Sequence, residues 1–589
     1  MAIHALAQSF NREDVWHLVS RHPVYSVLIC GAFISLSYRI WTGSKYSYAQ
    51  EQDITKEPPI LPHWVPWIGH GFSYIFNNAG LFTAARDESK DGVFAIELVG
   101  YKHYQVLMPS LVKQVFAQRA TVLSNKPLIH WLAKHGFGDE GTTAKVPELY
   151  SHISSNLNVL MTEAAIMDAS DRTARAVSET IRSFAVEQTR WGNESLTTVI
   201  GEKGEEIEVD FFRLVTRWAY CCSTPAMFGQ ALIEQCPQLM DDVFNFDSQF
   251  PLLITGLPPF TSKIRNARDA LNRSKKAIEM WHKAYGAIDD NDTPFPGWED
   301  MSDVSELAKM QHRTWKTGGK EVEKAAIANL LSLFWGLHTN ANIITFWTLV
   351  HIYSSAELLS AIRAEVAPHV KTLPTGQVSI DHSALSRQCP LTKSTWLETM
   401  RQDIVGVEQK YIQEDFTITE TPSDAALLRG QGAIPRSYEL KAGNVVCVHN
   451  GAAHTDPRLW EKPREFNPRR FIIKDPKDEK REKAESPRHL YVFGGGYSMC
   501  KGRLFAEREV LTFVTAIVTF WDIEFLGSKK STGEWIIKKG MEAGAPHPAG
   551  DAMSMWGCKQ FRLSLSKLSS YHPKVFKVNR LVFPYQVLD

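Results

Sequence analysis

The amino-terminal part of the chain contains one long apolar run, Val24–Trp41, in which Arg39 is the first charged residue. A helix over this run is about 27 Å long at about 1.5 Å per residue, close to the hydrocarbon thickness of a bilayer. Arg39 can extend its charge to the headgroups, and Trp41 suits the water interface. The pattern predicts a transmembrane anchor over residues 23–41. A cleaved signal peptide and a buried core helix are the alternatives.

Prolines mark the segment that follows. A polar stretch begins at Thr42, and Pro58–Gly71 then contains four prolines, namely Pro58, Pro59, Pro62 and Pro66. Proline fixes φ and cannot donate to a sheet, so the segment should be stiff and extended. We therefore expect a Pro-rich hinge over residues 42–71, a globular domain over 72–566, and a carboxy-terminal extension over 567–589 to which we assign no function.

The middle of the chain has a helical pattern. Lys320–Ser355 has no proline, one glycine (Gly336) and apolar residues over most of its surface, which predicts one long buried helix. Further helices are expected at Ser355–Val370 and Cys389–Asp403, and strands at Gln409–Ile418 and Asn444–Ala452. Helices outnumber strands, so the fold class should be mainly α with a smaller β part.

A loop at Phe246–Phe260 is unusually apolar and rich in turn residues. A loop of this kind either packs inward or touches a membrane, and the sequence leaves both open. We expect a substrate pocket lined by this loop, by residues 125–145, by the helix around Gly336–Asn340 and by the segment 540–550.

Composition narrows the class of protein. Hydrophobic residues make up 44% of the chain and charged residues 22%, as in globular proteins. Lys plus Arg and Asp plus Glu both number 65, which argues against a nucleic-acid binder with a basic surface. The eight cysteines contain no C-x-x-C pair, which argues against a zinc ribbon or a thioredoxin-type site.

One cysteine stands in an unusual setting. Gly494–Gly496 precede Cys500, and Gly502 and a helical pattern follow it. Glycines let backbone and a flat ligand approach closely, and the start of a helix favours a thiolate. A thiolate bound to haem iron promotes O–O cleavage. A buried structural cysteine in a turn is the alternative.

The loop resembles the haem-binding loop of the cytochrome P450 family, whose pattern is F-x-x-G-x-R-x-C-x-G. Phe493, Gly496, Cys500 and Gly502 match, whereas Ser498 stands in place of the arginine. The resemblance implies that these four residues bind haem b and that Cys500 is the axial thiolate ligand of its iron. It also implies a cytochrome P450 fold, with a triangular helix-rich domain, a β-rich region near the amino terminus and a single transmembrane helix.

Two further motifs agree with this family. Glu398 and Arg401 form its E-x-x-R motif, and the segment His454–Phe471 contains its P-x-x-F-x-P-x-R-F pattern, including Arg470. In the family the counterparts of Glu398, Arg401 and Arg470 form a buried structural triad. A buried arginine needs a carboxylate partner, which is the physical reason for this arrangement.

The helix expected over the haem departs from the family pattern A/G-G-x-D/E-T-T. One alignment places His338 at the acid and Thr339 at the alcohol. A second uses the flanking aromatic residues and places Asn340 at the distal position, as in the branch that contains cholesterol 7-alpha-hydroxylase and prostacyclin synthase. We prefer the second and take Asn340 and Thr339 as the candidate catalytic residues.

The resemblance implies a monooxygenase that oxidises a bulky apolar substrate, such as a sterol, a terpenoid or another secondary metabolite. Electrons would come from NADPH-cytochrome P450 reductase, with cytochrome b5 as a further candidate donor. The chain would be a single-pass protein of the endoplasmic reticulum membrane, with residues 1–22 lumenal and the catalytic domain cytosolic. A haem-thiolate isomerase or dehydratase of peroxides and a non-catalytic scaffold are the alternatives.

Overall fold

The computed structural model describes residues 23–51, 55–181, 184, 197–200, 206–256, 258, 260–374, 377–487, 489–525, 538–539, 548–549 and 561–564. The predicted segments 1–22 and 567–589 lie outside these ranges. So does the expected pocket segment 540–550, apart from residues 548–549.

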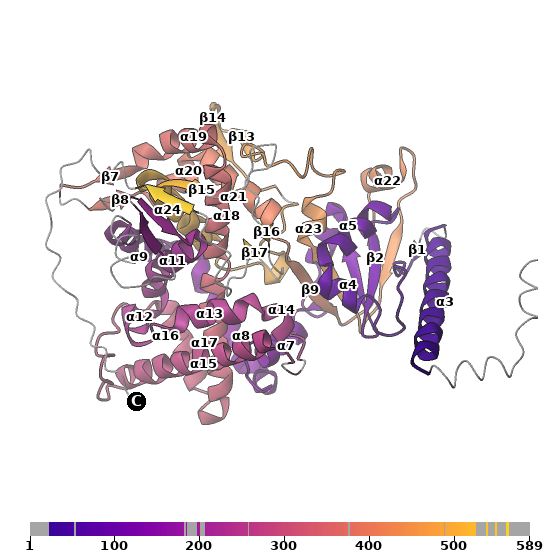
Figure 1. The fold of residues 1–589 in the computed structure, drawn as a ribbon, viewed down its shortest axis with the longest axis horizontal. Helices are drawn as coiled ribbons and strands as arrows, with labels where there is room; N and C mark the ends of the chain where they lie inside the picture. Colours follow the sequence, from indigo (N-terminus) through magenta and orange to yellow (C-terminus); the bar gives the residue numbers. More distant parts are fainter. Residues whose placement is uncertain are drawn as a thin grey trace, which may run out of the picture.

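Helices form the larger part of the molecule (Figure 1). The long helices of the body are α9 (Glu163–Thr180), α11 (Phe211–Phe228), α15 (Ser262–Asp289), α17 (Glu323–His338), α18 (Ala341–Tyr353), α21 (Pro390–Asp403) and α24 (Arg503–Phe520). Helix α18 packs against α11, α21 and α24, and residues of all four belong to one large hydrophobic core. Because α24 belongs to this core, the core supports the helix that directly follows the cysteine loop.

Shorter helices surround this core. They are α4 (Gly71–Phe76), α5 (Asn78–Glu88), α6 (Pro109–Phe116), α7 (Lys126–Gly136), α8 (Pro147–Asn156), α12 (Gln230–Gln235), α13 (Leu239–Ser248), α14 (Phe250–Leu253), α16 (Glu306–Lys316), α19 (Ala356–Val366), α20 (His382–Gln388), α22 (Pro422–Arg429) and α23 (Asn450–His454). Many begin at residues that favour helix starts. The Thr421 side chain, for example, forms a capping box with Asp424 at the start of α22.

The largest sheet has the order β2-β3-β12-β9-β4. Its strands are β2 (Val93–Leu98), β3 (Tyr101–Val106), β12 (Val445–His449), β9 (Val407–Ile412) and β4 (Leu123–Ser124). Strand β12 runs parallel to β3 and antiparallel to β9, so segments far apart in the chain share one sheet. The sheet lies beside α4 and α5 in Figure 1 and carries a second hydrophobic core.

The other strands form small sheets. A three-stranded sheet joins β1 (Thr55–Lys56), β11 (Ser437–Leu440) and β10 (Phe416–Thr419), and a four-stranded one joins β15 (Asp522–Phe525), β18 (Phe561–Ser564), β6 (Glu206–Val209) and β5 (Thr197–Ile200). Two-stranded pairs are β7–β8 (Val370–Thr372, Val378–Ile380), β13–β14 (Ile472–Asp475, Asp478–Ala484) and β16–β17 (Lys538–Lys539, Pro548–Ala549). The predicted fold class, mainly α with a smaller β part and one amino-terminal candidate span, is confirmed.

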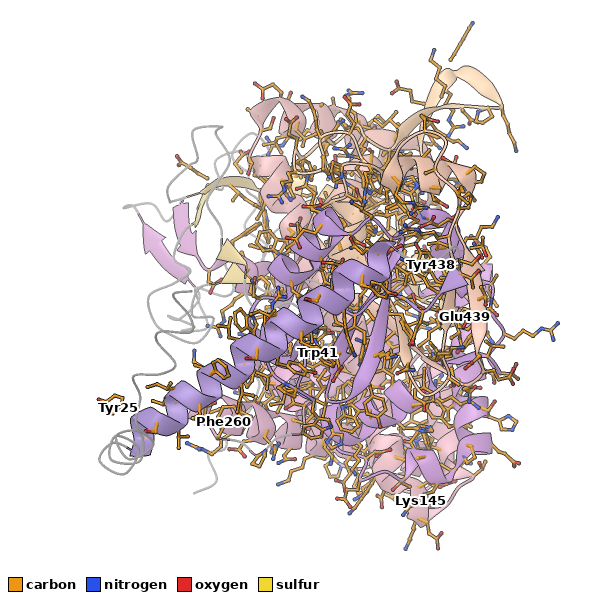
Figure 2. The ribbon with its side chains drawn as sticks, turned by 90° about the vertical axis from the view of Figure 1, so that its right-hand side faces the viewer. Tyr25, Trp41, Lys145, Phe260, Tyr438 and Glu439 are labelled. Carbon is orange, nitrogen blue, oxygen red and sulfur yellow. The ribbon has the colours of Figure 1, made fainter. Side chains whose placement is uncertain are left out.

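Helix α3 (Pro23–Glu51) contains the predicted anchor and continues beyond it. Residues Val24–Gln50 are long and apolar enough to cross a membrane, and their most apolar window is not buried in the protein. The polar stretch from Thr42, which we expected to be part of an extended hinge, is helical as far as Glu51 (Figure 2). The segment after Pro58 begins extended, as expected: the Leu61 N–H donates to the Ala95 carbonyl and the Ala95 N–H donates to the Pro59 carbonyl, each at 2.8 Å. It then turns, and the Gly69 N–H donates to the Val65 carbonyl at 3.0 Å.

The expected single helix Lys320–Ser355 is divided, so that prediction was wrong. A 3₁₀ turn at Lys320–Val322 precedes α17, and the chain breaks between α17 and α18 at Thr339 and Asn340. Asn340 has φ of −108° and ψ of −62°, outside the regular helical range. The Thr339 N–H and hydroxyl both donate to the Trp335 carbonyl, at 2.9 and 3.0 Å, so the helical hydrogen bonds continue as far as Thr339.

Candidate active site

Cys500 lies in a short loop directly before α24. Its backbone N–H donates to the Phe493 carbonyl at 2.9 Å, which closes the loop between the two residues. Taken over all its atoms, Cys500 is exposed. The surrounding protein nevertheless shields its sulfur from water, and this desolvation raises the pKa of the thiol. The N–H groups of Gly502 and Arg503 and the charge of Arg503 act in the opposite direction. These donors would hold a thiolate that is bonded to a metal ion.

The glycines before Cys500 serve the packing of the protein itself. A Cβ atom on Gly495 would overlap the ring of Phe116, and one on Gly496, whose φ is +66°, would overlap the Phe116 carbonyl. Gly502 differs, because a Cβ there would meet only Leu160, at 3.9 Å. Gly495 and Gly496 therefore allow helix α6 to approach the loop closely, in agreement with the expectation for backbone approach, and their approach to a ligand stays a prediction.

Ser498 replaces the family's arginine and bonds to a carboxylate instead. Its hydroxyl donates to Oε1 of Glu408 at 2.9 Å. Lys410, two residues further along β9, donates from Nζ to the Gly495 carbonyl at 3.1 Å and lies 3.4 Å from Glu408. The Lys410 side chain is 3% exposed, and burial lowers its pKa. Within the described part of the chain, Oε2 of Glu408 is buried without a hydrogen-bond partner.

We missed Glu408 and Lys410 in the sequence. The available signal was the alternation of strand β9, which places residues two apart on the same face. Lys410 of this pair supplies a buried cation to the cysteine loop, and it does so from the neighbouring strand β9 rather than from the loop itself. The sequence could not show that this strand lies next to the loop.

Glu398, Arg401 and Arg470 meet as one cluster. Arg401 donates from Nε and Nη2 to the two carboxylate oxygens of Glu398, at 2.8 and 2.7 Å. Arg470 Nε lies 3.0 Å from Oε2 of the same carboxylate. Glu398 and Arg401 are buried, so the bidentate geometry is what makes their burial tolerable.

The cluster connects to the cysteine loop through His454. Arg401 Nη1 donates to the His454 carbonyl at 2.6 Å, and the imidazole Nε2 of His454 accepts from the Tyr491 N–H at 3.0 Å. Tyr491 lies two residues before Phe493, where the loop begins. A continuous chain of hydrogen bonds therefore links helix α21 to this loop.

The residues around the break between α17 and α18 are of two kinds, exposed and buried. Gly336 and Asn340, one helical turn apart, are exposed, and a Cβ on Gly336 would meet nothing within 4 Å. His338 and Thr339 are buried. Asn342 donates to His338 Nδ1 at 3.4 Å, which leaves Nε2 to donate to Thr224 at 3.1 Å. Burial lowers the pKa of His338 to about 3, so it is neutral at physiological pH.

Aromatic side chains from three elements meet beside this break. The Trp335 indole stacks on Phe250 with centroids 4.9 Å apart, and Phe137 packs edge-on against Trp335 at 5.6 Å. Trp335 Nε1 donates to Asp247 at 2.6 Å, which fixes the indole. The structure thus brings together three of the four segments expected to line a pocket. Phe246, Phe250 and Leu253 are buried and Phe260 is 66% exposed, so the first half of the apolar loop packs inward.

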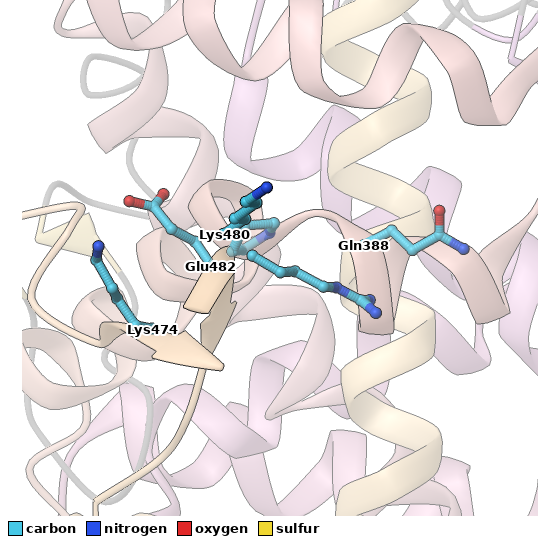
Figure 3. Close-up of a pocket in the computed structure, with 6 residues that line it drawn as sticks. Gln388, Lys474, Lys480 and Glu482 are labelled. Carbon is cyan, nitrogen blue, oxygen red and sulfur yellow. The ribbon is translucent and has the colours of Figure 1, made fainter. Parts of the chain in front are cut away.

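An open groove of about 960 Å³ lies elsewhere, between the end of α20, the start of α21 and the β13–β14 hairpin (Figure 3). Its lining residues are Gln388, Pro390, Lys474, Lys480, Arg481 and Glu482. None of them is a predicted site residue, and the lining is mostly charged. This groove does not suit a bulky apolar substrate.

Three features of the protein fit a haem group. Cys500 is an exposed residue whose sulfur faces N–H donors, a buried cation reaches the cysteine loop, and Gly336 on α17 is exposed, with no atom within 4 Å of a Cβ built there. In such a site Cys500 would bind the iron, and Gly336 would allow a flat ring and a substrate to approach α17 closely.

Comparison with known proteins agrees with this geometry. The family model "Cytochrome P450" matches residues 58–534. Cytochrome P450 7A1 of Oryctolagus cuniculus is 22% identical over 495 residues, covering 80% of this chain and 88% of the relative. Cytochrome P450 monooxygenase efuG of Hormonema carpetanum is 22% identical, covering 82% and 88%. The 25-hydroxycholesterol 7-alpha-hydroxylase of Rattus norvegicus is 25% identical over 334 residues, covering 55% and 72%.

The match of the family model covers most of the chain and includes all three motifs. The resemblance to the branch of cholesterol 7-alpha-hydroxylase is confirmed by these relatives. Members of this family bind haem through a cysteine thiolate, as the loop at Cys500 predicted. The chain therefore belongs to the cytochrome P450 family and is an enzyme of the monooxygenase type.

Proposed function

We propose that the protein is a membrane-anchored monooxygenase that inserts oxygen into a bulky apolar substrate of the sterol or terpenoid class. The observation that carries this proposal is the position of Cys500, an exposed residue in a loop that the buried Glu398 cluster supports through His454. The sterol class is supported by the rat relative, whose name specifies a sterol hydroxylase. The efuG relative is named only as a monooxygenase and does not restrict the substrate to sterols.

Cys500 is the proposed axial ligand of haem b, and Phe493, Gly496 and Gly502 shape the loop around it. When bound, the haem supplies the activation of molecular oxygen. The protein's contribution at the sulfur is a set of hydrogen-bond donors to a thiolate that bound iron would hold deprotonated. The N–H groups of Gly502 and Arg503 and the positive end of α24 stabilise the negative charge.

Asn340 is the proposed polar residue on the substrate side. Its amide carries both a donor and an acceptor, so it can orient a water molecule but cannot supply an acidic proton. Its exposure next to Gly336 supports this role. Thr339 is buried and its hydroxyl is engaged with the Trp335 carbonyl, so we assign it a structural role at the end of α17.

The aromatic wall formed by Trp335, Phe250 and Phe137 would exclude water and hold the apolar substrate. Electrons must come from another protein, for which we propose NADPH-cytochrome P450 reductase, with cytochrome b5 as a further donor. Helix α3 would place the protein in the endoplasmic reticulum membrane, with residues 1–22 in the lumen and 72–566 in the cytosol.

The test is to reconstitute the full chain with the reductase in lipid vesicles and to screen sterol and terpenoid extracts. We expect a product heavier by one oxygen atom whose formation requires both NADPH and O₂. The matched control is Cys500→Ser, which should abolish the product and the thiolate spectrum of the reduced carbon monoxide complex. Product formation from a peroxide without reductase would instead identify an isomerase or dehydratase.

A further inference from the structure

Three polar side chains form a hydrogen-bonded cluster in the interior, where helices α11, α17 and α18 contact one another. His338, the last residue of α17, donates from Nε2 to the Thr224 hydroxyl of α11 at 3.1 Å. Asn342 of α18 donates its amide to Nδ1 of the same imidazole at 3.4 Å. All three residues are 0% exposed. We call them the His338 bridge, because they join the end of α17 to two other helices.

The stability of the core does not require this bridge. A polar atom that is buried without a hydrogen-bond partner destabilises the folded state, and within the described part of the chain Oδ1 of Asn342 is such an atom. The rings of Tyr220 and Phe334 pack against the imidazole, with centroids 4.9 and 4.6 Å away. Apolar side chains of similar size would fill this space without leaving a polar atom unpaired. The bridge therefore points to a geometric role.

The bridge spans the break between α17 and α18. The Thr339 N–H makes the last backbone hydrogen bond of α17, and the Ile344 N–H makes the first of α18, to the Asn340 carbonyl. The N–H groups at the start of a helix have no partner within it, and the Asn340 side chain does not cap α18. His338 and Asn342 are four residues apart, so their side-chain bond connects the two helices where the backbone bonds are interrupted.

Asn340 lies midway between the two ends of this side-chain bond. Residues two apart along a helical chain point in roughly opposite directions, because each turn contains about 3.6 residues. Burial agrees with this geometry, since His338 and Asn342 are buried and Asn340 is exposed. Holding both neighbours from the interior therefore restricts the direction in which the Asn340 amide can point.

We propose that His338 is a positioning residue, which holds the break in one geometry and so directs the Asn340 amide toward the substrate side. This inference rests on the role proposed above for Asn340. His338 does not supply protons to the site, because both of its ring nitrogens are engaged in the bridge. Burial also lowers its pKa to about 3, so the imidazole is neutral.

The experiment uses the full chain with haem bound, reduced under carbon monoxide, and measures the C–O stretching band by infrared spectroscopy. Bound carbon monoxide is the probe, because its stretching frequency responds to nearby polar groups. The variants are His338→Leu, which removes both bonds of the bridge, His338→Gln, whose amide can keep both, and Asn340→Ala. The double variant His338→Leu/Asn340→Ala tests whether the two residues act through one another.

Two further variants keep the test independent of folding. Thr224→Val removes one of the two bonds and nearly preserves the side-chain shape, so it carries the test if His338→Leu does not fold. Thr216→Val is the matched control, because Thr216 is also buried on α11 and its hydroxyl bonds to the Phe212 carbonyl of its own helix at 2.7 Å. The melting temperature of each variant is measured beside its band.

We expect His338→Leu to shift the band in the direction in which Asn340→Ala shifts it. The double variant should shift it no further than Asn340→Ala alone. Thr224→Val should shift it by less, and His338→Gln should keep the wild-type band. Thr216→Val should lower the melting temperature without moving the band, as a purely structural change would.

A band that moves in Asn340→Ala but in neither His338→Leu nor Thr224→Val would overturn this inference and leave the proposed role of Asn340 intact. A band that Asn340→Ala does not move would overturn both. Additive shifts in the double variant would show that His338 affects the site independently of Asn340, which would also overturn the inference.

Discussion

Single side chains decide how the cysteine loop is held. Ser498 cannot carry the charge that the family usually places there, and its hydroxyl bonds to Glu408. Lys410 returns a positive charge from β9 and donates to the carbonyl of Gly495. A positive charge therefore lies near the loop, but it comes from Lys410 on β9 rather than from a residue of the loop itself.

Replacing Lys410 should weaken the retention of haem. Lys410→Met keeps most of the volume but removes a buried charged hydrogen bond, which is typically worth about 1.5–3 kcal/mol. We expect transfer of haem to an acceptor apoprotein to be roughly 10 to 100 times faster, since about 1.4 kcal/mol corresponds to a factor of ten. The control is Lys441→Met at an exposed ion pair. Equal transfer rates for both variants would remove Lys410 from this role.

The Glu398 cluster makes a second prediction for individual residues. Glu398→Gln is nearly isosteric but leaves Arg401 buried without a countercharge, a change that typically costs about 3–5 kcal/mol. We expect a lower urea midpoint of unfolding together with a lower haem content, because the hydrogen bonds through His454 reach the loop. Arg469→Gln, at an exposed neighbour of Arg470, should change neither quantity.

At the level of elements, the two candidate polar residues, Thr339 and Asn340, lie at the break between α17 and α18. Asn340→Ala should increase the fraction of NADPH electrons released as hydrogen peroxide, because an exposed amide that orients water is lost. Thr339→Val should change this fraction little and should mainly lower thermal stability, since its hydroxyl bonds to the Trp335 carbonyl. The opposite pattern would assign the distal role to Thr339.

Helices α11 and α24 share a buried acid. Ser223 donates to Glu509 at 2.5 Å, and burial raises the pKa of Glu509 to about 8. The folded chain therefore holds a proton that the unfolded chain releases above about pH 4.5, so this group makes stability fall as pH rises from about 4.5 to 8. In Glu509→Gln, the melting temperature should depend less on pH over this range. An unchanged pH dependence would show that Glu509 is ionised in the folded protein.

Sequence patterns predicted the elements well where the signal was local. The helix at Cys389–Asp403 is present, because proline placement is a local signal. The strand expected at Gln409–Ile418 is divided into β9 and β10, and the one expected at Asn444–Ala452 ends at His449, where α23 follows. The division of α17 from α18 escaped prediction because Asn340 leaves the helical backbone angles in a run that contains no proline. The motif residues Glu398, Arg401 and Arg470 could be found because their spacing is distinctive. Glu408 and Lys410 could not, because their role depends on which strand lies beside the loop.

For the whole molecule, hydrogen bonds connect the amino-terminal helix α3 to the catalytic body. The sequence predicted an anchor and then a hinge, whereas α3 continues to Glu51 and bonds to the body through Gln50. The helix ends at Glu51, before Pro58, the first of the four prolines. The polar residues before them gave no sign of the tertiary contacts that keep them helical.

The docking of α3 matters to anyone who wishes to crystallise the enzyme without detergent. Tyr46 packs against the core that contains the largest sheet, so removing the whole helix would uncover apolar surface there. A chain shortened to begin just before Thr42 lacks the apolar part of α3 but keeps Tyr46, which covers this surface. We expect it to remain monodisperse by light scattering, whereas a chain that starts at Thr55 should aggregate.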